Sequence, residues 1–258
     1  MNTEANIIRP SDSFVDEVEA FLTALDTTPP NSLTACAGWT AHEVVAHLVA
    51  AGVEVALNLE AYGDGRTVPT TRSFTEREAP YRDMADAALR DELPRSILRM
   101  GAALDAVLLA EPDAVVPWTG RQMVVKTFIT HLRSELALHR WDLVGDDATG
   151  DALLANPLLT DHAVTVLGRP LLARGIGSTI AQFRAAIGSP ETRDVVVVVD
   201  VEGPRLSYSN APSDPTVIGD PAARLLLLWG RRCGDPRRLR SLHGTTDLGQ
   251  LQSVLAGY

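Results

Sequence analysis

The hydrophobic residues of this chain change their spacing near residue 150, and that change constrains the fold more than any other feature. Before it, apolar side chains recur at helical spacing, as in the set Phe14, Val18, Phe21, Leu22 and Leu25. After it comes an apolar run over 194–201, a turn at Gly203-Pro204 and a second short run over 205–209, which is typical of a β-hairpin. Helices followed by a mixture of helices and strands predict an α+β protein.

The first part predicts a four-helix bundle. Thr40 and Glu43 form a capping-box pattern, with which helices commonly begin. Glycines and prolines between 62 and 80 predict a long loop, and Pro94 predicts a bend or restart. The expected helices cover 11–25, 40–59, 81–109 and 122–143.

The second part predicts a small α+β domain. Residues 146–156 are polar and have the composition of a linker. A helix is expected over 158–173, another over 221–231 behind the N-cap residue Asp220, and a last one over 247–255. We therefore expect two domains, residues 1–150 and 151–258.

Charge and cysteine usage exclude several classes of function. The chain has 258 residues and a net charge of −10, and residues 1–150 carry 12 basic against 23 acidic side chains. Such a chain is a poor candidate for binding nucleic acid or an anionic membrane. The first residues lack the pattern of a secretion signal, and the most apolar runs, 195–199 and 225–229, are too short to span a bilayer. With Cys36 and Cys233 as free thiols, we expect a cytoplasmic protein.

A candidate metal site lies on the helix expected over 122–143. His131, Glu135 and His139 are spaced by four and share one helical face. The two histidines stand about 12 Å apart along the axis, too far to grip one ion together. Glu135 therefore pairs with either His131 or His139. His47, on the apolar face of the preceding helix at 40–59, is the candidate third ligand. The alternative is that these histidines are ordinary hydrogen-bonded core residues.

A second candidate is a basic segment in the C-terminal part. Residues 231–240 contain five arginines in a chain that is otherwise acidic. A guanidinium group matches the geometry of a carboxylate, so the segment is a candidate anion site. The alternative is a solvated surface loop.

Three segments together resemble the mycothiol-dependent maleylpyruvate isomerase family. Cys36–Leu48 is similar to its C-x-G-W-T…H-L segment, and Glu135–Leu143 to its E-x-x-x-H…D helix. Thr216–Arg231 is similar to its G-D…W-G-R stretch. The resemblance covers nearly the whole chain. It implies a DinB-like metal-binding four-helix bundle followed by a small α/β domain like that of sterol carrier proteins.

The resemblance also implies a site. It makes His47, Glu135 and His139 the ligands of a divalent metal, zinc, and places His131 beside the metal as a catalytic residue. Mycothiol, a thiol of actinobacteria, is the implied co-substrate. One lysine, Lys126, among 23 basic residues agrees with the GC-rich genomes of such bacteria.

The activity that the resemblance implies is that of an isomerase or a thiol S-transferase acting on a small electrophile. The alternative is a family member recruited for thiol-independent metal chemistry or for ligand binding in a biosynthetic pathway. The family binds substrate through an arginine of the C-terminal domain, for which Arg238 and Arg240 are the candidates. We expect no nucleic-acid or membrane partner, and either a monomer or a homodimer.

Overall fold

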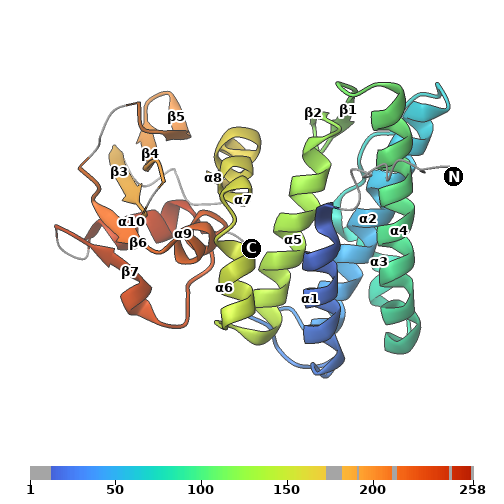
Figure 1. Cartoon of the computed structure of the whole chain (residues 1–258), viewed down its shortest axis with the longest axis horizontal. Coiled ribbons are helices and arrows are strands. Elements are labelled where there is room, and N and C mark those ends of the chain that lie inside the picture. The colour runs from blue at the N-terminus through green and yellow to red at the C-terminus, as the bar shows by residue number, and fades with distance from the viewer. Residues whose placement is uncertain (1–12, 173–181, 191, 211–213, 244–245, 257–258) are drawn as a thin grey trace, which may run out of the picture. The chain divides into compact units, whose positions relative to one another are not determined.

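The chain folds into two compact units (Figure 1). The computed structural model describes residues 13–172, 182–190, 192–210, 214–243 and 246–256. The first unit ends at Leu136 and the second begins at Ala137, inside one continuous helix, and the short segment Ala35–Ala37 belongs to the second. Each unit is described in turn.

The first unit is built on four long helices, as the sequence predicts. Its elements are α1 (Val15–Asp26), α2 (Ala41–Gly63), α3 (Phe74–Arg82), α4 (Asp86–Ala110), β1 (Val115–Trp118), β2 (Arg121–Val124) and α5 (Thr127–Val144). The helices α1, α2, α4 and α5 run alongside one another (Figure 1), and α2 packs along α4. Their facing side chains, among them Phe21, Leu59, Leu104 and Leu136, are fully buried.

Helix α2 is the central helix of this unit. The expected capping box is present: the Thr40 side chain accepts from the Glu43 amide, and the Glu43 side chain accepts from the Thr40 amide. By length and composition α2 could cross a membrane, but 78% of its most apolar window is buried inside the structure. That burial is typical of the core helix of a folded domain.

Three expectations for this part were wrong in detail. Residues 74–80, expected in the loop over 62–80, belong to helix α3 (Phe74–Arg82). An antiparallel hairpin of β1 and β2, which the sequence did not predict, lies between α4 and α5. Helix α4 runs through Pro94 without interruption, because the break falls earlier, between Arg82 and Asp86. Helix α5 begins at Thr127, since the residues before it belong to the hairpin.

The second unit adds a five-stranded sheet and further helices to the end of α5. Its helices are α6 (Ala148–Leu154), α7 (Pro157–Asp161), a π-helical segment (His162–Leu167), α8 (Arg169–Leu172), α9 (Pro221–Leu228), a 3-10 turn (Pro236–Arg238) and α10 (Thr246–Val254). The linker expected over 146–156 was wrong, because most of it forms α6 behind the N-cap Asp147. The helix expected over 158–173 is divided among α7, the π-helical segment and α8, and residue 173 lies outside the described ranges.

The sheet confirms the α+β class. Its strands are β3 (Phe183–Gly188), β4 (Val195–Asp200), β5 (Gly203–Tyr208), β6 (Val217–Gly219) and β7 (Leu239–Ser241), in the order β5-β4-β3-β6-β7. The expected hairpin is β4–β5, with Val199 opposite Pro204. β3 and β6 are parallel neighbours, and β7 is an edge strand antiparallel to β6. Val195, Val197 and Val199 of β4 are buried in one core with the leucines of α9.

Candidate metal centre

The site begins with His47, in the second turn of α2. Its side chain is buried, with 3% of the residue exposed, among the apolar residues of the bundle. The Trp39 ring lies 5.3 Å away between centroids, and the Phe74 ring of α3 stacks on the imidazole at 5.8 Å. The ring is therefore held on two sides by aromatic groups.

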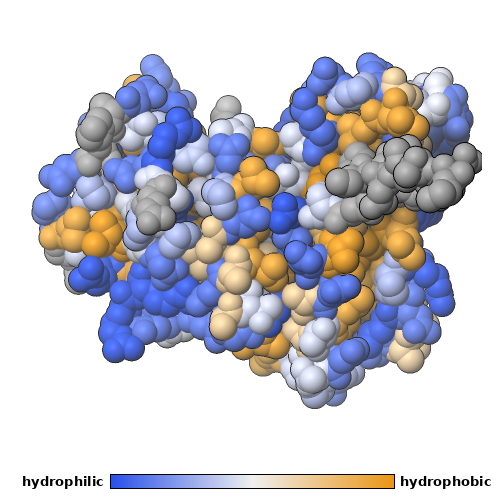
Figure 2. Space-filling view, viewed as in Figure 1, coloured by the Kyte–Doolittle hydropathy of each residue, from blue (hydrophilic) through white to orange (hydrophobic). Residues whose placement is uncertain are grey.

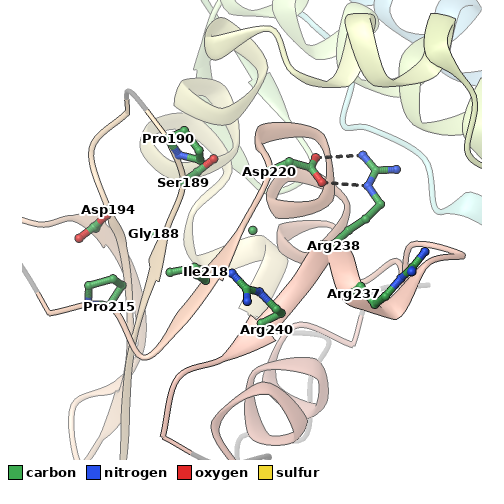
Figure 3. Close-up of a pocket in the computed structure, with 11 residues that line it drawn as sticks. Gly188, Ser189, Pro190, Asp194, Pro215, Ile218, Asp220, Arg237, Arg238 and Arg240 are labelled. Carbon is green, nitrogen blue, oxygen red and sulfur yellow. Dashed lines mark hydrogen bonds and ion pairs between the residues drawn. The ribbon is translucent and has the colours of Figure 1, made fainter.

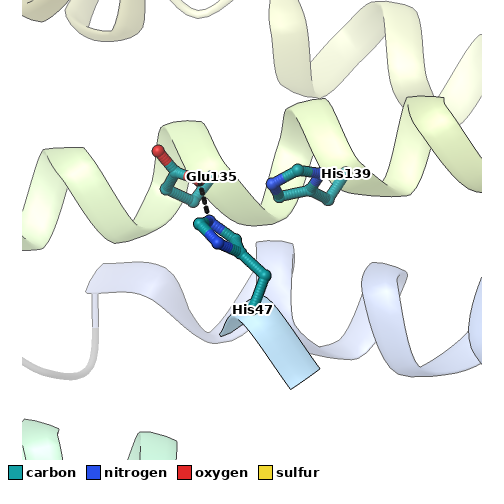
Figure 4. Close-up of side chains that lie close together, drawn as sticks. All are labelled: His47, Glu135 and His139. Atoms are coloured by element: carbon teal, nitrogen blue, oxygen red, sulfur yellow. Dashed lines mark hydrogen bonds and ion pairs between the residues drawn. The ribbon is translucent and has the colours of Figure 1, made fainter. Parts of the chain in front are cut away.

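Glu135 and His139 lie one turn apart on α5, and His47 faces them (Figure 4). Each of the three residues offers one ligand atom, and these atoms lie within 4.8 Å of one another. His47 Nε2 is 3.3 Å from Glu135 Oε2. All three residues are buried. Because Glu135 and His139 share one continuous helix, the helix itself sets their relative position.

The donor set suits a divalent transition metal. Two imidazoles and one carboxylate, with room for further ligands, are typical of catalytic zinc sites. The ring orientations also fit. His47 Nδ1 lies 2.7 Å from Glu78 Oε1 and His139 Nδ1 lies 2.8 Å from Asp142 Oδ2, so each ring has its Nε2 left for a metal. A metal-binding histidine commonly donates its other ring nitrogen in this way.

Glu78 is held in place by an arginine. Arg82, one turn further along α3, donates to Glu78 Oε2 from Nη2 at 2.9 Å. Burial by itself raises the pKa of Glu78, but the contacts with His47 and Arg82 outweigh it, and the pKa lies below its usual value. Glu78 is therefore a carboxylate at neutral pH, as the acceptor of an imidazole N–H should be.

Asp142 is held in the same manner. Arg231 donates to both of its oxygens, from Nε at 3.2 Å and from Nη2 at 2.8 Å, and also to the Trp229 carbonyl oxygen. Burial raises the pKa of Asp142, whereas His139 and Arg231 lower it and prevail. The Asp142–Arg231 contact joins residues 89 positions apart, one in the E-x-x-x-H…D segment and one in the W-G-R segment.

His131 lies one turn before Glu135 on α5. Its Nε2 is 3.7 Å from Glu135 Oε1, and its side chain is 20% exposed. Burial is the largest cause that lowers the pKa of His131; the charges of Arg121 and Arg77 act in the same direction, and Glu135 opposes them. The three-residue ligand cluster does not include His131.

Arg238 and Arg240 both belong to the second unit, at a surface hollow (Figure 3). Arg238 donates to Asp220 at 2.8 and 2.9 Å and to Asp151 at 2.7 Å, and these contacts, that with Asp220 foremost, raise its pKa. Arg240 is exposed on β7. A ligand-binding role for either arginine stays a prediction.

Sequence reasoning missed the carboxylates behind the two histidines. The loop expected over 62–80 includes Glu78, although Ser73 and Glu76 form the same capping-box pattern as Thr40 and Glu43, and that box begins α3. Asp142 belongs to the E-x-x-x-H…D segment, but nothing in the neighbouring sequence indicates its contact with Arg231.

Comparison with known proteins agrees with this architecture. Two crystal structures of mycothiol-dependent maleylpyruvate isomerase, one of them a histidine-to-alanine mutant, match with TM-scores of 0.62 and 0.63 at 15% identity. Each match covers 92% of this chain and 95% of the other, which shows a shared fold. No curated protein matches the chain significantly. The sequence model of the mycothiol maleylpyruvate isomerase N-terminal domain matches residues 12–144, and the chain therefore belongs to the family that this domain defines.

Proposed function

We propose that this protein is a metal-dependent enzyme that uses mycothiol as a thiol co-substrate on a small electrophile. The observation that carries the proposal is the meeting of three buried ligand atoms within 4.8 Å. Family membership supports the choice of thiol. The placement of the chain in the cytoplasm, where reduced thiols are abundant, belongs to the same proposal.

His47, Glu135 and His139 would hold the metal, which we propose to be zinc. A bound divalent ion would supply positive charge that deprotonates a thiol at neutral pH. The protein's own part is orientation. Glu78 and Asp142 fix the two imidazole rings, and burial of the three ligands limits access of bulk water. His131, partly exposed beside Glu135, is placed to exchange a proton with a bound thiol or substrate.

Two reactions follow from one thiolate. Addition of sulfur to a conjugated double bond, rotation about the resulting single bond and expulsion of the thiol make an isomerase, and the thiol is regenerated. Retention of the carbon–sulfur bond makes an S-transferase, and the thiol is consumed. An assay that follows both maleylpyruvate and free mycothiol separates the two reactions. The alternative, thiol-independent metal chemistry or ligand binding, predicts no interaction with mycothiol.

Metal analysis is the first test. We expect one equivalent of metal in the wild type and loss of metal in His139→Ala. His42→Ala is the matched control: His42 also lies on α2, but its ring contacts Asp86 and the Arg82 carbonyl oxygen. Equal metal content in the wild type and in His139→Ala would overturn the site. Titration calorimetry of the metal-loaded protein with mycothiol then tests the thiol, and absence of binding at millimolar thiol would favour the thiol-independent alternative.

A further inference from the structure

One side of α4 carries a row of exposed apolar residues. Leu98 is 73% exposed and Leu109 is 88% exposed. They are eleven positions apart, which is about three turns of helix, so both point in nearly the same direction. Ala102 and Ala106 are exposed between them on the same side. These four residues are called the apolar row of α4, and Figure 2 shows hydrophobic side chains over the part of the first unit in which α1 and α4 lie.

The apolar row is separate from the side of α4 that stabilises the bundle. Leu93, Ile97 and Leu104 of that other side are buried, and α2 packs along the helix. A surface helix commonly turns polar residues toward water, and a single exposed leucine is ordinary. Two leucines and two alanines that adjoin one another form a patch, and such patches are typical of protein–protein contacts. The row is therefore a candidate docking surface.

The apolar row matches a reversed copy of itself. Leu98 and Leu109 are its two ends, at equal distances from its midpoint. When two α4 helices run antiparallel about a two-fold axis at this midpoint, each Leu98 meets the Leu109 of the other copy. Ala102 and Ala106 lie near the axis, where small side chains let two helices approach closely. Asp105, which is partly exposed, lies at the edge of the row and stays in contact with water.

The charges on α4 fit the same arrangement. Arg95 is exposed about one turn before Leu98, on the side of the apolar row. Glu111 at the C-cap and Asp113 after it are exposed beyond Leu109. In the antiparallel pair, Arg95 of one copy lies level with these two carboxylates of the other. A parallel pair would instead bring the two acidic ends together, and like charges across an interface are unfavourable.

The contacts that these charged groups make within one chain compete only weakly with a second copy. They are Arg95 with Glu92, Asp113 with Lys126, and Glu111 with the Tyr62 hydroxyl. All of them lie at the surface, where ion pairs contribute little to stability. The contact of Glu111 is with a neutral group, so it does not balance the charge of the carboxylate. Arg95 of a second copy would balance it.

From these observations we propose that the protein forms a homodimer through the apolar row, with the two α4 helices antiparallel. The partner is a second copy of this chain, because the row and its flanking charges are complementary to themselves when reversed. Such a contact uses the same surface on both copies and closes at the dimer. The row is short compared with the interface of an obligate dimer, so we expect a dissociation constant of roughly micromolar magnitude. The proposal does not depend on metal or thiol chemistry.

Sedimentation velocity of the full chain, from about 1 to 200 µM, tests the dimer. We expect monomer at the low end and dimer at the high end. Leu109→Glu sets a charge against Leu98 twice in each dimer and should raise the dissociation constant about 100-fold or more. Leu33→Glu is the matched control: Leu33 is 79% exposed and lies outside the apolar row, and the change should leave the constant within about twofold.

A charge exchange tests the antiparallel orientation. Arg95→Glu sets like charges against each other and should weaken the dimer about tenfold. The double variant Arg95→Glu/Glu111→Arg restores opposite charges between the copies and should return the dissociation constant to within about threefold of the wild type. Equal thermal midpoints of wild type and variants, measured on the dilute monomers, show that the substitutions leave the fold intact.

Four results would overturn the proposal. The first is a protein that stays monomeric at about 200 µM, and the second is assembly beyond the dimer, which a two-fold contact does not allow. The third is an equal effect of Leu109→Glu and Leu33→Glu, which would place the contact elsewhere or reduce it to general surface charge. The fourth is a lower thermal midpoint of the Leu109→Glu monomer, because it would mean that the chain itself covers the row. Failure of the charge exchange alone would overturn the antiparallel orientation.

Discussion

At the scale of single residues, the candidate metal centre repeats one arrangement twice. Each histidine of the cluster contacts a carboxylate through Nδ1, and each carboxylate is held by an arginine. Helical spacing predicted that His131, Glu135 and His139 share one face. It left open which of the two histidines binds a metal together with Glu135. The resemblance selected His139, and the structure brings His139 rather than His131 into the cluster.

Glu78→Gln tests the first of these contacts. The change keeps the size of the side chain and removes its charge, so the His47 ring becomes a poorer ligand. We expect zinc affinity to fall about tenfold or more, the range known for partners of metal-binding histidines. Competition with a chromogenic chelator measures it. Asp83→Asn, at the exposed end of the same helix, should leave affinity unchanged, and an equal loss in both variants would contradict the assignment.

His131→Ala separates chemistry from metal binding. His131 lies outside the ligand cluster, so metal content should equal that of the wild type. If it exchanges a proton during turnover, kcat should fall about 100-fold or more. Metal analysis and the mycothiol-dependent isomerisation assay are run on the same preparation, with His42→Ala as the control. An unchanged kcat would show that His131 takes no part in the chemical step.

At the scale of elements, the sequence predicted those helices and strands that have a local signal of their own. The capping signals at Thr40 and Asp220 predicted α2 and α9, and the apolar run of valines predicted β4. The sequence did not predict the β1–β2 hairpin. Its two-residue turn is Thr119-Gly120, and both residues have positive φ. Asparagine-glycine is the usual signal for such a turn, and a β-branched threonine is not. Contacts such as Arg231 with Asp142 are set by tertiary packing, which no local window contains.

The turn predicts a stabilising substitution. Thr119 has φ 48° and is strained there, because its branched Cβ crowds the backbone. Thr119→Asn should raise the free energy of unfolding by about 0.5–1 kcal/mol. Urea denaturation monitored by circular dichroism measures it. Thr70→Asn, an exposed change without positive φ, should have little effect, and a comparable gain there would remove turn strain as the cause.

Helix α6 depends on Asp147. This residue caps the helix and binds the buried Arg140 through both oxygens at 2.8 Å. Asp147→Asn should cost about 1–2 kcal/mol at pH 7, less than for a fully buried pair because Asp147 is partly exposed. Asp91→Asn, at an exposed carboxylate, is the control.

The same pair predicts a pH dependence. The hydrogen bond from Arg140 is the main cause that lowers the pKa of Asp147 in the fold. The stabilisation from the Arg140–Asp147 pair is therefore fully present above the pKa of Asp147 in the unfolded chain, about 3.9. It is lost as the pH falls through the lower pKa of Asp147 in the folded protein. The stability difference between wild type and Asp147→Asn should shrink below about pH 4. Urea midpoints measured from pH 7 down to pH 3 would test this. A constant difference would contradict the ion-pair explanation.

At the scale of the whole molecule, a helical pattern followed by a mixed pattern of helices and strands was sufficient to predict the α+β fold class. A bundle precedes a mixed sheet unit, and the similarity to the isomerase structures extends over 92% of the chain. The predicted domain boundary at residue 150 stays a prediction. The compact units divide at Leu136, within a helix whose sequence contains no glycine or proline to mark a boundary.

The continuity of α5 limits how genes of this family can be recombined. A crossover that exchanged the C-terminal sequence at Leu136 would inherit Glu135 from one parent and His139 from the other. A crossover after Val144 would keep both, but Arg231 would then come from the second parent and have to meet an Asp142 with which it had not evolved. Functional chimeras should therefore come from parents matched at both residues. Shuffling libraries can enforce that match by fixing Asp142 and Arg231 as a linked pair.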